Sequence, residues 1–115
     1  MTKEERIFRQ YLESMFTYTQ RSILAFCLKR HTPVCFYGSG LGKSTLVKIL
    51  RNAGFENVYA PEDCGCDNAQ WSVLDKQGAV ALRMQKGSFD RPLPKNPFSK
   101  ETIYAVCADV LEHTR

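Results

Sequence analysis

The segment from Val34 to Leu46 constrains this chain more than any other part of its sequence, which there reads VCFYGSGLGKSTL. A short apolar run leads into three glycines, and these lead into Lys43 and Ser44 at the start of a helical pattern. Glycine lets the backbone turn sharply and approach a ligand closely, and the amides at a helix N-terminus attract anions. The segment therefore predicts a buried strand, a phosphate-binding turn and a helix, in that order.

The predicted phosphate-binding residues follow one another without a gap: Gly38, Ser39, Gly40, Leu41, Gly42, Lys43, Ser44 and Thr45. We expect Lys43 to reach the outer phosphates and to be catalytic, and the Ser44 hydroxyl to join the ligands of a magnesium ion. The expected cofactors are therefore Mg²⁺ and either ATP or GTP. No motif that would distinguish adenine from guanine is visible in the sequence.

This segment resembles the Walker A motif of the P-loop NTPases, GxxxxGK[ST]. The motif has a glycine five residues before Gly42, and this chain has Tyr37 at that position. Two interpretations stay open: the turn begins at Gly38 and is one residue short, or Tyr37 fills its first position. A bulky residue is disfavoured there if the turn requires a positive φ.

Length and composition set the expectation for the fold. With 115 residues, we expect a single domain, residues 1–115, made of a helical N-terminal segment, 1–31, and a P-loop core, 32–115. The resemblance implies a small three-layer α/β fold with a short, mainly parallel sheet and a C-terminal helix. The 43 % of apolar and 24 % of charged residues are typical of a soluble globular protein. No apolar run approaches the roughly 20 residues that span a bilayer, so we expect no membrane partner.

Cysteine usage predicts the redox compartment. Five cysteines are present, an odd number, and the charged N-terminus is not a signal peptide. These features predict free thiols in a reducing, cytoplasmic compartment. Cys27, Cys35 and Cys107 lie in apolar surroundings and are predicted core residues. Cys64 and Cys66 alone fall short of the paired spacing of a zinc site.

The first 31 residues carry a helical pattern. Thr2 and Glu5 form a predicted capping box, and apolar pairs then recur with one polar interruption near Thr19–Gln20. The segment is therefore either one long helix or two helices joined at that point. Its aromatic residues are predicted to lie in the core or in a contact with a second copy or a partner protein: Phe8, Tyr11, Phe16, Tyr18 and Phe26.

After the turn, the pattern predicts a helix over residues 43–53, a strand over 58–60 and a hairpin with strands over 70–74 and 79–84. Residues 86–100 are rich in proline and are predicted to be irregular, with basic side chains suited to a lid or to a nucleic-acid contact. The last helix is predicted from its cap and its inward side: Ser99, then Ile103, Val106, Cys107, Val110 and Leu111.

Hydrolysis would need an acidic residue that holds magnesium beside the phosphates. The candidates that follow apolar runs are Asp63, Asp75 and Asp109. We assign the metal-binding and catalytic roles to Asp63, because it follows the strand after the phosphate-binding helix, and ligands gather at the ends of parallel strands. Arg83 and Arg91 are the candidate cations for stabilising a transition state.

The order of elements is also similar to that of small viral helicases of superfamily 3. The matching parts are a helix ending in 28–30, the strand and Walker A segment, and then Trp71–Leu74 with a further apolar run. Those helicases carry two acids after that run, and this chain carries Arg83-Met84. The turn is also similar, minus one residue, to that of the AAA+ replication initiators.

These resemblances imply a protein that binds a nucleoside triphosphate, ATP first, and that serves nucleic-acid replication or processing. The net charge of +4 is compatible with a nucleic-acid partner. Whether the protein hydrolyses the triphosphate stays open, because the sequence has no clear acidic motif to complement the Walker A segment. Two alternatives also stay open: a small phosphotransferase (kinase), and a non-catalytic protein that keeps the turn as structure and binds partners.

Overall fold

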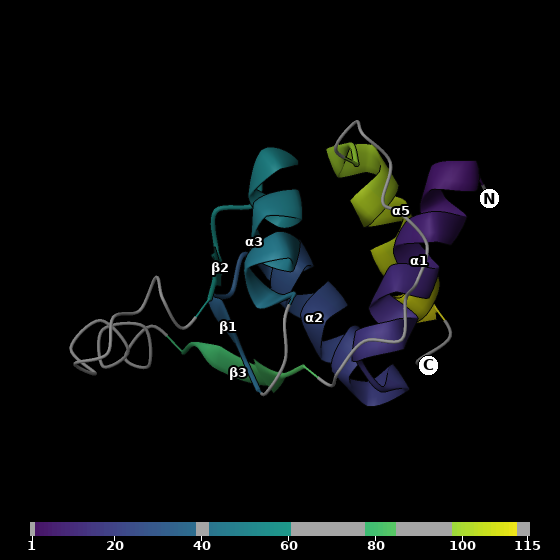
Figure 1. Cartoon of the computed structure of the whole chain (residues 1–115). Coiled ribbons are helices and arrows are strands. Elements are labelled where there is room, and N and C mark those ends of the chain that lie inside the picture. Colours follow the sequence, from purple (N-terminus) through teal and green to yellow (C-terminus); the bar gives the residue numbers. More distant parts are fainter. Residues whose placement is uncertain (1, 39–41, 61–77, 85–97, 113–115) are drawn as a thin grey trace.

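The computed structural model describes residues 2–38, 42–60, 78–84 and 98–112. Figure 1 shows its elements along the chain, which are α1 (Lys3–Met15), α2 (Tyr18–Arg30), β1 (Val34–Tyr37), α3 (Lys43–Asn52), β2 (Val58–Tyr59), β3 (Val80–Arg83) and α5 (Lys100–Glu112). None of the described helices is long and apolar enough to cross a membrane.

The described strands form one parallel sheet in the order β2-β1-β3. Val34 of β1 pairs with Val58 on one side and with Val80 on the other. The predicted short, parallel sheet is therefore confirmed within the described residues. The strand predicted over 79–84 is present as β3, but its described partner is β1; the predicted hairpin partner, 70–74, lies outside the described residues.

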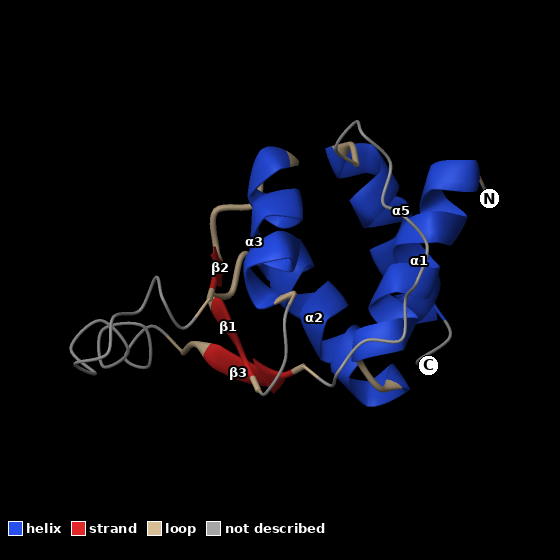
Figure 2. Cartoon of the chain, viewed as in Figure 1, coloured by secondary structure: helices blue, strands red, loops and turns tan. Residues whose placement is uncertain are grey.

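The two faces of the sheet have different surroundings. Val34, Phe36 and Leu82 are buried in a cluster to which every described helix contributes side chains. Cys35, between Val34 and Phe36, instead packs with partly buried side chains on the opposite face. Figure 2 shows the same arrangement, with the helices gathered on one side of the strands. The described residues thus form two layers, and the third layer that was expected stays a prediction.

The N-terminal segment consists of two helices. The Thr17 side chain accepts a hydrogen bond from the backbone amide of Gln20, and the Gln20 side chain accepts one from the amide of Thr17. This reciprocal pair starts α2 and separates it from α1. The predicted capping box of Thr2 and Glu5 is confirmed at the start of α1 by the same two kinds of hydrogen bond.

The helical N-terminal residues share one core with the sheet. The ring centres of Phe8 and Phe98 are 5.1 Å apart, and those of Phe16 and Phe36 are 5.9 Å apart. Phe8, Tyr11 and Phe16 are buried, as predicted for the aromatic residues of this segment. Tyr18 and Phe26 are 43 % and 44 % exposed, so these two are not core residues.

The three cysteines in the described residues are buried free thiols, as predicted: Cys27, Cys35 and Cys107. Burial raises the pKa of the Cys107 thiol to about 12 and also raises the pKa of Cys27. These two thiols therefore stay protonated at neutral pH and act as small apolar groups. Cys64 and Cys66 lie outside the described residues.

Replacing Thr17 by alanine removes the acceptor for the Gln20 amide at the start of α2. We expect the free energy of unfolding to fall by about 1 kcal/mol, the usual cost of losing a helix cap. Urea denaturation followed by circular dichroism measures this change. Thr19→Ala is the matched control, because Thr19 is an exposed threonine in the same turn and does not cap the helix. Equal stability of the two variants would contradict the capping role.

Candidate phosphate-binding site

The turn after β1 begins at Gly38. Tyr37 still belongs to β1 and pairs with Arg83 of β3. Gly38 has a φ of 126°, and a Cβ atom at this position would lie 2.5 Å from the carbonyl oxygen of Met84. Both the backbone conformation and the close approach therefore require glycine. Of the two interpretations left open by the sequence, the structure supports a turn that starts at Gly38 and is one residue shorter than the Walker A pattern.

Backbone pairing holds the ends of β1 and β3 together. The amide of Met84 donates to the carbonyl of Tyr37 at 2.7 Å, which extends the parallel pairing by one residue beyond β3. The carbonyl of Arg83 also accepts a hydrogen bond, from the Gln20 side chain of α2 at 2.9 Å. The helical layer thus fixes the strand end that lies against Gly38.

The start of α3 has no side-chain cap. Gly42 is its N-cap residue, with a φ of 123°, and the first turn contains no acidic residue. Because Gly42 has no side chain, it cannot bind the first amides of the helix as Thr17 does in α2. The partial positive charge at this end of α3 is therefore available to an anion. Ser44 and Thr45 are both exposed there.

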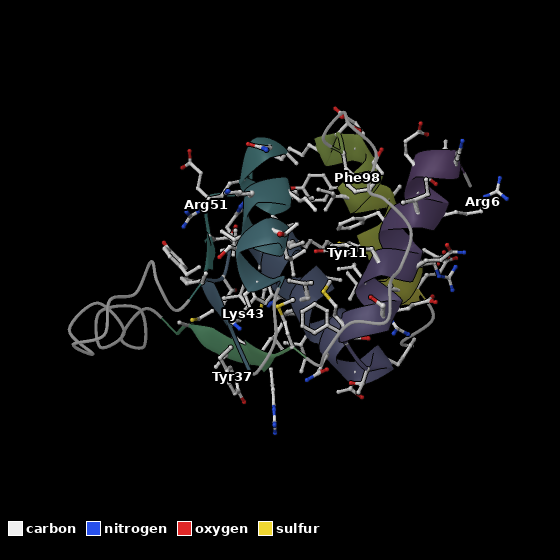
Figure 3. All side chains as sticks on the ribbon, viewed as in Figure 1. Arg6, Tyr11, Tyr37, Lys43, Arg51 and Phe98 are labelled. Atoms are coloured by element: carbon white, nitrogen blue, oxygen red, sulfur yellow. The ribbon has the colours of Figure 1, made fainter. Side chains whose placement is uncertain are left out.

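Lys43 connects the two ends of the turn. Its Nζ donates a hydrogen bond to the carbonyl oxygen of Gly38 at 2.7 Å. Figure 3 places Lys43 where the start of α3 meets the sheet. The ammonium group at the start of α3 is thus held against the first residue after β1. A phosphate oxygen carries a full charge and would bind this ammonium more strongly than the neutral carbonyl does.

Of the predicted phosphate-binding residues, the structure describes five and joins two of them, Lys43 and Gly38, by a hydrogen bond: Gly38, Gly42, Lys43, Ser44 and Thr45. Ser39, Gly40 and Leu41 lie outside the described residues, so their role stays a prediction.

Asp109 is removed from the candidate acids. It lies on α5, and its carboxylate oxygen is 3.0 Å from a guanidinium nitrogen of Arg9 on α1. The two residues belong to the helical layer, so Asp109 has a structural partner and is not at the end of a strand. Asp63 and Asp75 lie outside the described residues, and the metal-binding role of Asp63 stays a prediction.

The described strand ends beside the turn carry no carboxylate. The chain continues from β3 through Arg83 into Met84, and β2 ends at Tyr59 and continues into Ala60. Within the described residues there is also no group of three His, Cys, Asp or Glu side chains that could hold a metal ion. The expected role of Ser44 as a magnesium ligand therefore stays a prediction.

The aliphatic part of the Arg83 side chain lies beside the first residue of the turn. The Cγ atom of Arg83 would be 3.5 Å from a Cβ atom on Gly38, and the side chain of Arg83 is exposed. In the sequence, only the residue type made Arg83 a candidate cation. The β1–β3 register places it next to Tyr37, the residue before the turn. Arg91 lies outside the described residues. Gln20, which positions the end of β3, has no local sequence signal for this role.

Comparisons of the chain with protein-family models, with curated proteins and with solved structures found no match.

Replacing Gly38 by alanine places a Cβ atom against the Met84 carbonyl in a strained backbone conformation. We expect the free energy of unfolding to fall by about 2–3 kcal/mol. Gly78→Ala is the matched control: Gly78 has a φ of 79° and open space around it, so only the backbone strain of about 1 kcal/mol applies. Denaturant titration compares the two, and an equal loss would argue against the close contact.

Proposed function

We propose that this protein binds a nucleoside triphosphate, with ATP as the first candidate, at the turn between β1 and α3. The observation that carries the proposal is the Lys43 ammonium held over Gly38 at the uncapped start of a helix. Each part is common by itself, but together they place a cation and a helix N-terminus on the same small volume. This combination suits a polyphosphate better than a single small anion.

The described residues have separate roles in this proposal. The amides at the start of α3 bind phosphate oxygens, and Lys43 leaves the Gly38 carbonyl to bind the outer phosphates. The exposed Ser44 hydroxyl fits the ligand shell of a magnesium ion, which neutralises phosphate charge when it is bound. Gly38 and Gly42 keep the backbone free of side chains where the phosphates lie.

Nucleotide binding is the main proposal, and hydrolysis of the nucleotide is secondary to it. Turnover requires an acid near the magnesium ion and an oriented water molecule. The strand ends described beside the turn carry Arg83, Met84 and Ala60 instead of an acid, and this favours the non-catalytic alternative. A catalytic function would require Asp63 to supply the missing acid near the magnesium ion. The three buried free thiols are in keeping with the proposed reducing, cytoplasmic compartment.

Lys43→Ala should weaken the binding of ATP with magnesium by about 10- to 100-fold, because a charge-assisted hydrogen bond to phosphate is lost. Isothermal titration calorimetry measures the affinity, and circular dichroism checks that the fold is kept. Lys48→Ala is the matched control, since it removes the same charge from an exposed position on the same helix. The assignment fails if the two variants bind ATP equally well.

Ser44→Ala should remove most of the dependence of ATP affinity on magnesium, because the hydroxyl that contacts the ion is absent. The measurement compares titrations in magnesium with titrations in a chelator. Thr45→Ala keeps every backbone amide and should retain the magnesium dependence of the wild type. An unchanged magnesium effect in Ser44→Ala would overturn the role given to this hydroxyl.

A further inference from the structure

One side of α2 is exposed, although the middle of that side is apolar. Residues spaced four, three and four positions apart form a row along the helix, which we call the α2 row, and all of them are exposed: Thr19, Ile23, Phe26 and Arg30. Ile23 is 38 % exposed and Phe26 is 44 % exposed. The sequence predicts Phe26 either in the core or in a contact with another molecule, and this exposure rules out the core.

The other side of α2 anchors the helix in the protein. Its buried residues belong to the shared core: Leu24, Ala25, Cys27 and Leu28. The Gln20 side chain donates to the Arg83 carbonyl of β3 at 2.9 Å, which adds a polar contact near the start of the helix. A molecule that binds the α2 row therefore does not have to order the helix first, and binding avoids that entropic cost.

Arg30 lies over the aromatic ring within the α2 row. Its guanidinium carbon is 4.1 Å from the centre of the Phe26 ring, which is a cation–π distance. A guanidinium stacked in this way presents its N–H groups at its edge, and these groups match the two oxygens of a carboxylate. The α2 row thus places an oriented carboxylate-binding group next to an apolar surface.

The charge at this end of α2 is positive. Lys29 and Arg30 are both exposed in the last turn, and α2 contains no aspartate or glutamate. No acid within the described residues forms an ion pair with either of these two cations. Their position favours the helix itself through its dipole, but it leaves their hydrogen-bonding groups to another molecule. The molecule that complements this charge is acidic.

We propose that the α2 row docks an acidic amphipathic helix of a partner protein. Apolar side chains of that helix pack on Ile23 and Phe26, and a carboxylate beside them binds the Arg30 guanidinium, with Lys29 adding attraction. The spacing of the α2 row by four and three residues is the spacing with which one helix packs against another. Charge complementarity selects an acidic helix over a basic one.

Three other occupants suit the α2 row less well. A second copy brings the same cations and no acid from its own α2, so its charges do not complement the row. A membrane surface needs a broad apolar face, and the α2 row has only Ile23 and Phe26. Nucleic acid stacks its bases on aromatic rings, and Arg30 already lies over the Phe26 ring.

The α2 row is separate from the turn that is proposed to bind the triphosphate. Its residues belong to α2, whereas Lys43 belongs to α3 and binds the Gly38 carbonyl. The proposal goes beyond nucleotide binding and does not depend on it. Lys43→Ala should therefore weaken nucleotide binding and leave the affinity of the α2 row unchanged, so the two proposals fail independently.

The test measures fluorescence anisotropy of a labelled helical peptide of about 18 residues with the full chain. The peptide has leucines at heptad spacing with glutamates beside them, and its control has lysines in place of the glutamates. We expect the glutamate peptide to bind more tightly and to lose affinity as salt is added. Phe26→Ala should weaken binding by about 10-fold or more. Tyr37→Ala is the matched control, because this ring is 45 % exposed but lies on β1.

The carboxylate contact is tested with Arg30→Lys, which keeps the charge but loses the planar guanidinium. This variant should bind the glutamate peptide more weakly than the wild type. Arg6→Lys, an exposed arginine of α1, is its control and should bind like the wild type. Circular dichroism checks that each variant keeps the fold. Equal affinities of Arg30→Lys and Arg6→Lys would overturn the contact.

The proposal is overturned if neither peptide binds, if both bind equally well, or if Phe26→Ala behaves like Tyr37→Ala. Analytical ultracentrifugation tests for a second copy, and vesicles of phosphatidylglycerol test for a membrane. Self-association that Phe26→Ala abolishes would put a second copy on the α2 row. Vesicle binding that Phe26→Ala abolishes would put a membrane there, and either result overturns the proposal.

Discussion

The close approach of the ends of β1 and β3 organises the region around the turn. The Met84 amide binds the Tyr37 carbonyl, and the Met84 carbonyl lies where a side chain on Gly38 would have to be. The chain can leave β1 at this point only through glycine in a positive-φ conformation. Lys43, the first residue of α3, binds the Gly38 carbonyl, and the β1–β3 pairing places Arg83 beside Tyr37.

The two faces of the sheet carry different side chains in the described residues. The inner face, with Val34, Phe36 and Leu82, anchors all the described helices in one core. The outer face carries small and aromatic residues that contribute little to that core.

Local features of the fold could be predicted from the sequence because their causes are local. The capping box at Thr2, the strand–turn–helix order from Val34 onward and the inward side of α5 all follow from residue type and spacing. The pairing of β3 with β1 depends on residues far apart in the chain, and no local pattern specifies it.

Side-chain partners across the chain were equally inaccessible to sequence reasoning. Phe98 belongs to a segment predicted to be irregular, yet it is buried against Phe8. Asp109 follows an apolar run like a metal-binding acid, but it pairs with Arg9 of α1. In the site, Lys43 binds the Gly38 carbonyl, so its contact with phosphates stays a prediction, and Asp63 lies outside the described residues.

The side chain of Gln20 meets two demands that only an amide can meet together. Its oxygen accepts from the Thr17 amide at the start of α2, and its nitrogen donates to the Arg83 carbonyl at the end of β3. Glutamate serves a capping box as well as glutamine does in an isolated helix. A carboxylate at position 20 would keep the first contact, but it would set two acceptors against each other in the second. The helix start alone would tolerate either residue, and it is the strand beside the turn that makes the amide necessary.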